Sequence, residues 1–494
     1  MGQVGSTVHT SRNPIAPVKK IWHSPAMMTW LALAVRLGGF ALLMPLVLAN
    51  FTAAEVSVWL LFSAIASFQV VADFGFGPTF SREIAYGFAG HTMVEKDRPV
   101  AGLATAATPT GPDWDAIASA TAAMLWLYRR IALATFILLA VFGTWATMVP
   151  IERVAQSHAA WVAWGIVTVT TATAIYGNAY SSFLIGANRI DLLKRLEIVV
   201  GGISLLVQLI TLILDMGLLG FVLVAQIGLV VQVFVNRTLA FRLSGGRFGN
   251  AGQIANNKLV LRSMWPAAWR TALGAVMSIG IAQGMAIAMA NLLVAAEAAS
   301  VQLGLRVMQI ISQCSQVPFY TRIPELNRLG AVGHASQLAA AAASAMRSSL
   351  LIFVSMAVIV DLGVRQLFML LGSHTPFPDK LFWLVLVLAV FSERFGAMHI
   401  QLLLTKNKAI SHIANAVTGV IWLAGMIILY PMIGSLALPS SMLIAYAGFY
   451  AWYSASTSHK VLALPRAWKF ERATSLPSLV FILLYTACMA IVYP

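Results

Sequence analysis

The chain has 494 residues, of which 59% are hydrophobic and 10% are charged, whereas a soluble domain carries about 25% charged residues. This composition excludes a soluble globular protein and indicates a membrane protein with several spans. The 32 Lys and Arg against 17 Asp and Glu give a net charge of +15, which on a soluble chain would suggest binding to nucleic acid or another anionic surface. Cys314 and Cys488 both lie in apolar runs, which excludes a disulfide framework or a CxxC metal site.

Apolar runs of about the 20 residues that a helix needs to cross a bilayer follow one another along the whole chain. The first half contains six, at 27–49, 56–78, 131–149, 160–184, 195–214 and 218–240. The second half contains six more and a final one, at 266–291, 299–320, 348–371, 381–404, 410–430, 434–457 and 475–493. The first run carries Arg36 near its middle and is longer than the apolar region of a signal peptide, so we interpret it as a retained span.

The basic residues are concentrated on one side of this predicted bundle. Of the 32 Lys and Arg, 25 fall in the loops on the side of the N-terminus, whereas the opposite side holds Arg153 and Lys380. The positive-inside rule therefore places the N-terminus in the cytoplasm. On the same side, the segment from Trp114 to Arg130 is predicted to be an amphipathic helix lying on the membrane surface.

The spans and basic segments predict two lobes of six helices. The expected organisation is a cytoplasmic tail, an N-terminal lobe, a basic inter-lobe segment, a C-terminal lobe and a basic linker with one additional span, at 1–26, 27–241, 242–265, 266–459 and 460–494. Because each lobe has an even number of spans, both begin on the same side of the membrane, so the repeat is parallel and the lobes can rock about a shared central cavity.

An internal similarity supports the duplication. A shift of 240 residues aligns the ends of the second span of each lobe, pairing Gln69 with Gln309, Asp73 with Gln313, Pro78 with Pro318 and Arg82 with Arg322. Each lobe therefore ends its second span with Pro-x-x-[Ser/Thr]-Arg, and matches at equivalent positions in the topology indicate an internal repeat.

Five arginines lie within the predicted spans: Arg36, Arg270, Arg306, Arg365 and Arg394. An arginine near the centre of a span costs about 2.5 to 3.5 kcal/mol on insertion scales, so these side chains are expected to face protein or water. Arg365 follows Asp361 by four residues and can pair with it, and Arg270 is close enough to a helix end to reach the interface. Arg36 has no acid within helical reach, although Asp73 on the next span offers one.

Polar residues form a stripe along the eighth span, at positions Gln302, Arg306, Gln309, Gln313 and Gln316. Their spacings of four and three place them on one helix face, which cannot face lipid. We interpret the stripe as the wall of a water-filled cavity; the alternative is hydrogen bonding that holds helices together.

Two further groups of residues are singled out. Glu393 and Arg394 lie in the middle of the tenth span, and because neighbouring residues of a helix point about 100° apart, we expect them not to pair with each other but to join a charge network or couple an ion. His399 is expected to be a hydrogen-bonded packing residue. Gly75, Gly77 and Pro78 end the second span and are expected to permit bending there.

The segment from Asp73 to Ile84, with the sequence DFGFGPTFSREI, resembles the signature of polysaccharide-biosynthesis flippases, and the segment from Tyr180 to Ile190 is similar to the same family. These proteins belong to the multidrug/oligosaccharidyl-lipid/polysaccharide exporter superfamily, which has two six-helix lobes and often extra C-terminal helices. One additional span departs from the twelve or fourteen that are commoner in that superfamily.

The resemblance implies a transporter that moves an undecaprenyl-diphosphate-linked oligosaccharide across the bacterial inner membrane by alternating access, without catalytic residues, cofactor or metal. Its expected residue roles are diphosphate binding by Arg36, Arg270 and Arg306; polar cavity lining by Gln302, Gln309, Gln313, Gln316, Gln69 and Asp73; and gating by the motif residues Gly75, Gly77, Pro78, Arg82, Pro318 and Arg322. Expected partners are membrane lipids, a glycan polymerase and glycosyltransferases, but not nucleic acid, and the protein is expected to be a monomer.

Two alternative functions have similar requirements. A lipid II flippase for peptidoglycan also carries a diphosphate headgroup. A cation-coupled drug antiporter would need acids within the membrane, whereas the predicted spans hold five basic and three acidic residues, a balance that favours an anionic cargo. A membrane polymerase or glycosyltransferase would be expected to have a large extracytoplasmic loop or a nucleotide-sugar domain, and the sequence predicts neither.

Overall fold

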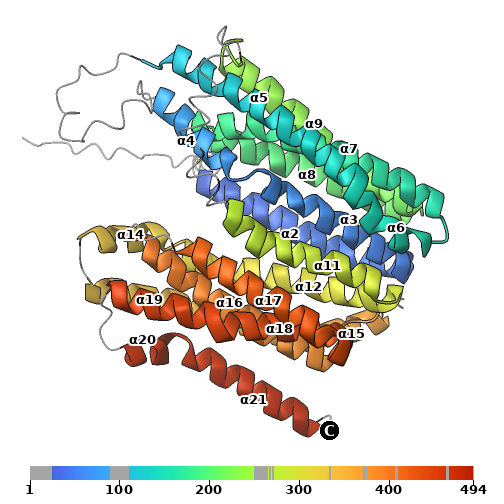
Figure 1. The fold of residues 1–494 in the computed structure, drawn as a ribbon, viewed down its shortest axis with the longest axis vertical. Helices are drawn as coiled ribbons and strands as arrows, with labels where there is room; N and C mark the ends of the chain where they lie inside the picture. The colour runs from blue at the N-terminus through green and yellow to red at the C-terminus, as the bar shows by residue number, and fades with distance from the viewer. Residues whose placement is uncertain are drawn as a thin grey trace, which may run out of the picture.

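The computed structural model describes residues 25–88, 111–249, 265, 269, 272–332, 335–370, 375–405, 410–462 and 467–492. Within these ranges every regular element is a helix (Figure 1), which confirms the predicted all-α fold class. Arg270 lies outside the described residues, as do most of the N-terminal tail and the inter-lobe segment. Arg36 lies on a described helix, but its side chain and that of Arg365 are outside the described part of the chain.

The N-terminal half consists of long helices joined by short turns. In chain order these are α2 (Pro25–Asn50), α3 (Ala53–Ala72), α4 (Phe76–Phe88), α5 (Trp114–Leu138), the π-helical turn η3 (Leu139–Gly143), α6 (Thr144–Glu152), α7 (Ser157–Gly186), α8 (Ile190–Ile213) and α9 (Gly217–Leu243). Two residues connect α2 to α3. The second of them, Thr52, forms a reciprocal capping box with Glu55 that begins α3. Helices α7, α8 and α9 pack against one another, and α2 packs on α8.

The segment from Trp114 to Arg130 does not lie on the membrane surface, so that prediction is wrong. It is the first part of a continuous helical run, Trp114–Glu152, of 39 residues, which is about 58 Å long at 1.5 Å per residue. Its Met124 and Tyr128 are fully buried, because α5 packs between α4 and α7. The polar residues that suggested a surface helix belong to the part of this run that extends beyond the bilayer.

The C-terminal half begins with η5 (Val276–Gly280) and α11 (Ile281–Leu292), followed by α12 (Ala295–Ser315), the short helices α13 (Val317–Tyr320) and α14 (Ile323–Val332), α15 (Ala335–Leu370) and α16 (Lys380–Leu404). The remaining elements are α17 (Ser411–Ile433), η6 (Gly434–Leu436), α18 (Ala437–Ala445), η7 (Tyr446–Ala451), α19 (Trp452–Leu462), α20 (Ala467–Thr474) and α21 (Leu476–Val492). The last helix lies along the outside of this half, where Tyr485 donates a hydrogen bond to Asp361 of α15 (Figure 1).

The helical run Ser411–Leu462 makes a hairpin rather than one span. Its 52 residues would measure about 78 Å as a straight helix, more than twice the hydrocarbon thickness of about 30 Å. Gly434 interrupts the run with φ 56° and ψ −135°, a conformation that a side chain disfavours. The chain reverses there, and α17 and α18 pack against each other.

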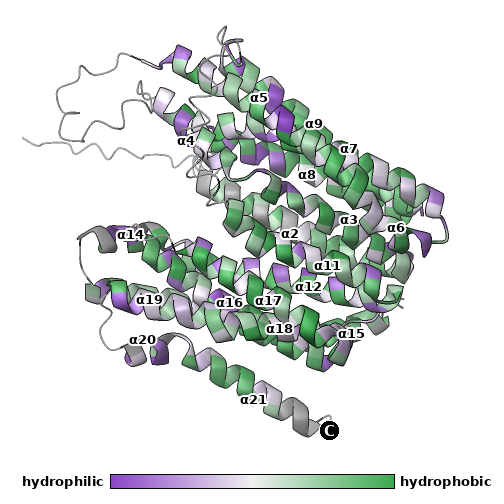
Figure 2. Cartoon of the chain, viewed as in Figure 1, coloured by the Kyte–Doolittle hydropathy of each residue, from purple (hydrophilic) through white to green (hydrophobic). Residues whose placement is uncertain are grey.

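The outward-facing sides of the helices are apolar, as expected for a lipid-exposed surface. Leu206, Ile213 and Phe234 on α8 and α9 are each more than 60% exposed, which in water would be an aggregation surface. Figure 2 shows long hydrophobic stretches along the helices and hydrophilic residues gathered largely at one end, where α4, α14 and α20 lie. We call this the basic end, because its exposed residues include Arg82, Arg322 and Lys469. Eight helical runs in the described part are long and apolar enough to cross a membrane, so the chain is a multi-pass membrane protein.

Candidate functional site

A cavity of about 770 Å³ lies where the two halves of the chain meet. It is bounded by α3 from the N-terminal half and by η5, α11, α12, α16, α17, α18 and η7 from the C-terminal half. The hydroxyl, amide and charged side chains that line it are Ser63, Ser67, Gln69, Ser278, Gln283, Gln302, Arg306, Gln309, Ser312, Glu393, Arg394 and Tyr446. A polar cavity of this size inside an apolar bundle requires water or a polar ligand.

The polar stripe of the eighth span is divided by the structure. Gln302, Arg306 and Gln309 lie on the cavity wall along α12. The helix ends at Ser315, so Gln316 lies beyond it and lines a second, smaller cavity instead, while Gln313 lines neither. Three of the five polar residues in the predicted stripe therefore line the main cavity, and the last two do not.

Arg306 is held in the cavity by two neighbours. Its Nη1 donates a 2.8 Å hydrogen bond to Oε1 of Gln309, and its guanidinium carbon lies 5.1 Å from the centre of the Phe40 ring on α2, within the range of a cation–π contact. The planar guanidinium also suits bidentate binding of phosphate oxygens. An arginine oriented in this way in a polar cavity is a candidate anion-binding group.

Glu393 and Arg394 pair with each other, so the expectation that they do not is wrong. Arg394 donates from Nε to one carboxylate oxygen of Glu393 and from Nη2 to the other. The 100° between adjacent positions separates the bases of the two side chains, but their length allows the ends to meet. Both side chains are partly shielded from solvent, which strengthens the pair relative to one in water.

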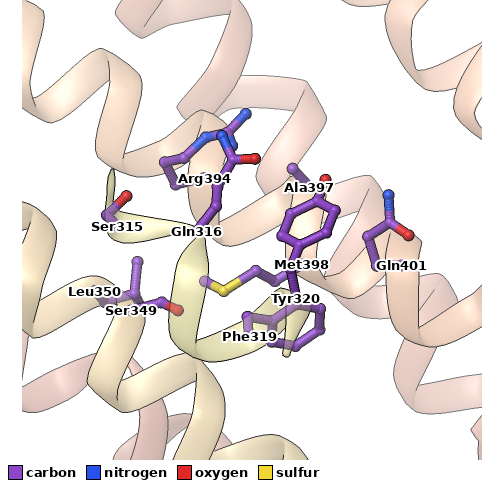
Figure 3. Close-up of a pocket in the computed structure, with 10 residues that line it drawn as sticks. All are labelled: Ser315, Gln316, Phe319, Tyr320, Ser349, Leu350, Arg394, Ala397, Met398 and Gln401. Atoms are coloured by element: carbon purple, nitrogen blue, oxygen red, sulfur yellow. The ribbon is translucent and has the colours of Figure 1, made fainter. Parts of the chain in front are cut away.

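Arg394 also lies at the wall of a second cavity. Its side chain lines the second cavity together with Gln316, Tyr320 and Gln401 (Figure 3). In Figure 3 the guanidinium of Arg394 and the amide of Gln316 lie side by side above the apolar floor that Phe319 and Met398 form. Arg394 therefore lines both cavities, whereas Glu393 lines only the larger one.

The two sequence segments that resemble the flippase family contact each other. The turn between α3 and α4 has Phe74 and Gly75 at φ 50° and 69°, and Asp73 closes it by accepting hydrogen bonds from the Gly77 amide (3.1 Å) and from the hydroxyl of Tyr128. Ser81 then donates a 2.9 Å hydrogen bond to the carbonyl of Ser182. Asp73 thus belongs to this packed joint and does not line the cavity.

A close helix approach completes the joint. A Cβ atom on Gly186 would lie 2.6 Å from the carbonyl oxygen of Ser81 and 2.8 Å from Ile84, so only glycine fits at this position. Gln69, one turn before the joint, lies in the cavity wall and donates a 3.4 Å hydrogen bond to Asn178 of α7. Arg82 and Arg322, the ends of the repeated motif, are exposed at the basic end, and Pro318 lies at the start of α13.

Hydrogen bonds join the two halves at the end opposite the basic end. Arg153, after α6, donates from Nη1 to the carbonyl oxygens of Leu293 (2.6 Å) and Ala290 (3.3 Å). In return, Nδ2 of Asn291 donates to the carbonyl of Ala146 (2.8 Å). We call Arg153 and Asn291 the clamp. Deeper in the bundle, Gln302 is buried and donates to Oγ of Ser57 on α3 (3.3 Å).

Several of these residues were not predicted from the sequence. Ser63 and Ser67 lie in an apolar helix, where a serine hydroxyl can donate to the carbonyl four residues earlier, as both do here. Serines are therefore compatible with an apolar span, and only their spacing, which places them on the same helix face, distinguishes them. Gln283 is an isolated amide in a largely apolar run, with no periodic pattern around it that would single it out. The sequence offered one indication for Arg153: it is one of only two basic residues in the loops on the side of the membrane opposite the N-terminus.

No protein-family profile and no curated protein sequence matches this chain. Solved structures do match. One is the inward-facing conformation of a multidrug resistance MATE family transporter of the MOP superfamily, with a TM-score of 0.61, 13% identity, and coverage of 88% of this chain and 95% of that one. The outward-facing conformation of such a transporter matches with a TM-score of 0.53, 13% identity, and coverage of 90% and 97%.

Lipid II flippase MurJ, in its inward closed conformation, matches with a TM-score of 0.52, 13% identity, and coverage of 88% of this chain and 92% of that one. The chain therefore has the fold that MATE transporters and MurJ share. At this identity the likeness establishes the fold alone, and the cargo must be argued from the cavity.

Proposed function

We propose that the protein is a flippase that moves a diphosphate-linked lipid oligosaccharide from the cytoplasmic to the outer leaflet of a bacterial inner membrane by alternating access, without making or breaking a covalent bond. The observation that carries this proposal is the charge of the cavity. Among its described lining residues are two arginines, Arg306 and Arg394, and one acid, Glu393. Glu393 is paired with Arg394, and the charged residues in the described lining sum to +1.

The remaining lining suits a sugar headgroup. Amides of Gln69, Gln283 and Gln309 and hydroxyls of Ser63 and Ser67 face the cavity, and such groups both donate and accept hydrogen bonds as sugar hydroxyls require. Arg36 and Arg270 stay predicted diphosphate ligands, and the interactions of Gln302 with Ser57 give that residue a gating role in addition to cargo contact.

The contacts between the two halves support alternating access from a state that opens at the basic end. The clamp joins the halves at the opposite end, the Gln302–Ser57 hydrogen bond joins them at the cavity wall, and the positive-inside rule assigns the basic end to the cytoplasm. In this state the cargo enters from the cytoplasmic side. A gradient-driven cycle is expected, since the sequence contains no nucleotide-binding loop.

The charge of the cavity lining also bears on the two alternative functions, a lipid II flippase and a drug antiporter. Lipid II carries a diphosphate and a sugar headgroup, so a lipid II flippase fits the cavity equally well, and only the family resemblance of the segments at Asp73 and Tyr180 favours a polysaccharide precursor. A drug antiporter would need an available acid for a cationic cargo. In the described lining Glu393 is engaged by Arg394, and Asp73 is engaged in the joint by Tyr128, which disfavours a cation.

The experiment that tests the proposal compares diphosphate binding by Arg306→Ala and Arg347→Ala variants of the purified protein. Arg347 is an exposed arginine on α15 outside the cavity and serves as the matched control. With farnesyl diphosphate as the probe and tetraphenylphosphonium as the cationic comparison, the Arg306 variant should lose about tenfold or more in affinity for the diphosphate, since charge-assisted hydrogen bonds contribute about 1.5 to 3 kcal/mol. Unchanged affinity would contradict the proposed role, and preferential binding of the phosphonium would favour the antiporter.

Cargo identity is resolved in cells. Depletion of the protein should remove a surface glycan while growth continues, if the cargo is a polysaccharide precursor. Lysis with accumulation of peptidoglycan precursor would instead identify a lipid II flippase. Transport that persists after collapse of both the ion gradient and the membrane potential would contradict gradient coupling.

A further inference from the structure

Three potential metal ligands meet at the basic end of the C-terminal half, away from the cavity. His399 lies near the end of α16, His459 near the end of α19 and Glu471 on α20. One ligand atom from each lies within 4.8 Å of the other two. From the sequence, His399 was predicted to be a packing residue. Its two partners follow 60 and 72 residues later in the chain, and only the tertiary fold brings them close to it.

The distances suit a small tetrahedral metal ion. Oε1 of Glu471 lies 2.8 Å from Nε2 of His459 and 3.3 Å from Nε2 of His399. Ligand atoms bound to tetrahedral zinc at about 2.0 to 2.1 Å are separated from one another by about 3.3 Å. The two distances from Glu471 differ from this value by no more than about half an ångström, and the ligand atoms of the two imidazoles lie within 4.8 Å of each other.

The surroundings also match those of a metal site. His399 is completely buried, and within the described part of the chain neither of its ring nitrogens makes a hydrogen bond. Oε2 of Glu471 is occupied by hydroxyls of Thr474 (3.1 Å) and Ser475 (3.5 Å), which directs Oε1 toward the two imidazoles. Such second hydrogen bonds orient carboxylate ligands.

Two aromatic rings restrict solvent access to the cluster. Phe470 packs edge-on against both imidazoles, and Phe395 packs against His399.

We propose that His399, His459 and Glu471 bind one divalent transition-metal ion of the zinc class, which fastens α20 and the start of α21 to the ends of α16 and α19. Two imidazoles select such ions over magnesium and calcium, which prefer oxygen ligands. Three protein ligands leave a fourth position for water. The metal would act as a structural clip for the last helix, so this inference is independent of the cargo proposed above.

The test uses the full-length protein, purified in detergent with an affinity tag that contains no histidine. After incubation with Zn²⁺ and desalting, elemental analysis should find about one zinc per chain, and Co²⁺ should give the visible absorption bands of a four- or five-coordinate site. Removal of a ligand should weaken Zn²⁺ binding by more than the roughly 10- to 100-fold that loss of a second-sphere partner causes.

The variants are His459→Ala and Glu471→Gln, because both residues are only partly buried and their replacement is better tolerated than that of His399. His158→Ala is the matched control, since His158 is exposed at the start of α7, far along the chain from the cluster. The proposal is overturned if the wild-type protein retains no zinc and shows no such cobalt spectrum. It is also overturned if both ligand variants, eluting as the wild type does in size-exclusion chromatography, retain as much zinc as the His158 variant.

Discussion

The clamp offers a direct test of alternating access, because Arg153 spans the two halves of the molecule. Replacing Arg153 by alanine removes its hydrogen bonds to the carbonyl oxygens of Leu293 and Ala290. Hydrogen bonds from a charged group contribute about 1.5 to 3 kcal/mol. Since the Arg153 side chain is exposed, we take the lower value of about 1.5 kcal/mol, which shifts the equilibrium toward the state open at this end by about tenfold.

The population of that open state can be measured by thiol labelling at position 302. Gln302 is 4% exposed in the closed arrangement, so a cysteine there is shielded until the halves separate. In a background with Cys314→Ser and Cys488→Ser, the labelling rate at Gln302→Cys should rise by about tenfold when Arg153→Ala is added, provided that opening is fast relative to labelling. The loss of the Gln302 hydrogen bond to Ser57 is common to both proteins and cancels in the ratio.

Two controls isolate the geometry of the clamp. Arg153→Lys keeps the positive charge but not the planar group that reaches two carbonyls, so its labelling rate should fall between the other two. Arg347→Ala removes an exposed arginine elsewhere and should leave the rate unchanged. An Arg153→Ala protein that is folded and labels at the original rate would show that these contacts do not control opening.

Two further predictions concern the joint and the ion pair. Gly186→Ala should lower the free energy of unfolding by about 1 to 3 kcal/mol, and with it the unfolding temperature, because its Cβ would overlap the carbonyl oxygen of Ser81. Gly201→Ala is the control, since its added atom meets open space, and it should raise stability or leave it unchanged. Equal losses of stability in the two variants, measured by thermal unfolding, would contradict the packing argument. Glu393→Gln should increase diphosphate affinity by freeing the charge of Arg394, and unchanged or weaker binding in the farnesyl diphosphate assay would show that Arg394 does not contribute to cargo binding.

The architecture followed from the sequence because membrane insertion depends on local properties. Run length and hydropathy are readable from the chain itself, and they predicted an all-helical membrane protein with several spans, which the structure confirms. The failure at Trp114–Arg130 has the same origin. Polar residues on a helix that continues past the bilayer produce the same pattern as a helix lying flat on it, and only the burial of Tyr128 against neighbouring helices separates the two.

The site was harder to predict because it depends on which helices become neighbours. Arg306 and Gln309 could be identified from their periodicity on one helix, but the pairing of Glu393 with Arg394 depends on side-chain conformations that helix geometry does not restrict. The meeting of His399, His459 and Glu471 requires three separate helix ends to converge. No spacing in the sequence encodes that convergence, since each residue is isolated in its own segment.

Two errors in the predicted spans have the same form in both halves of the chain. The predicted spans 56–78 and 299–320 extend past the observed ends of α3 at Ala72 and of α12 at Ser315. Both errors arise because the breaks are followed at once by apolar residues, so hydropathy continues where the helix stops. After each break a short helix begins with Pro78 or Pro318 in its first turn, a position that proline favours.

A break that recurs at equivalent places is difficult to explain by local sequence preference alone. In the first half, positive φ angles at Phe74 and Gly75 make the break, whereas the second half reaches the same result at Gln316 with an ordinary helical φ. The two halves therefore reach one outcome by different local solutions, and the predicted internal repeat offers a reason why the break has the same position in both. Both breaks follow the helices that supply Gln69 and Gln309 to the cavity, so movement at either break would tilt a cavity wall relative to the basic end.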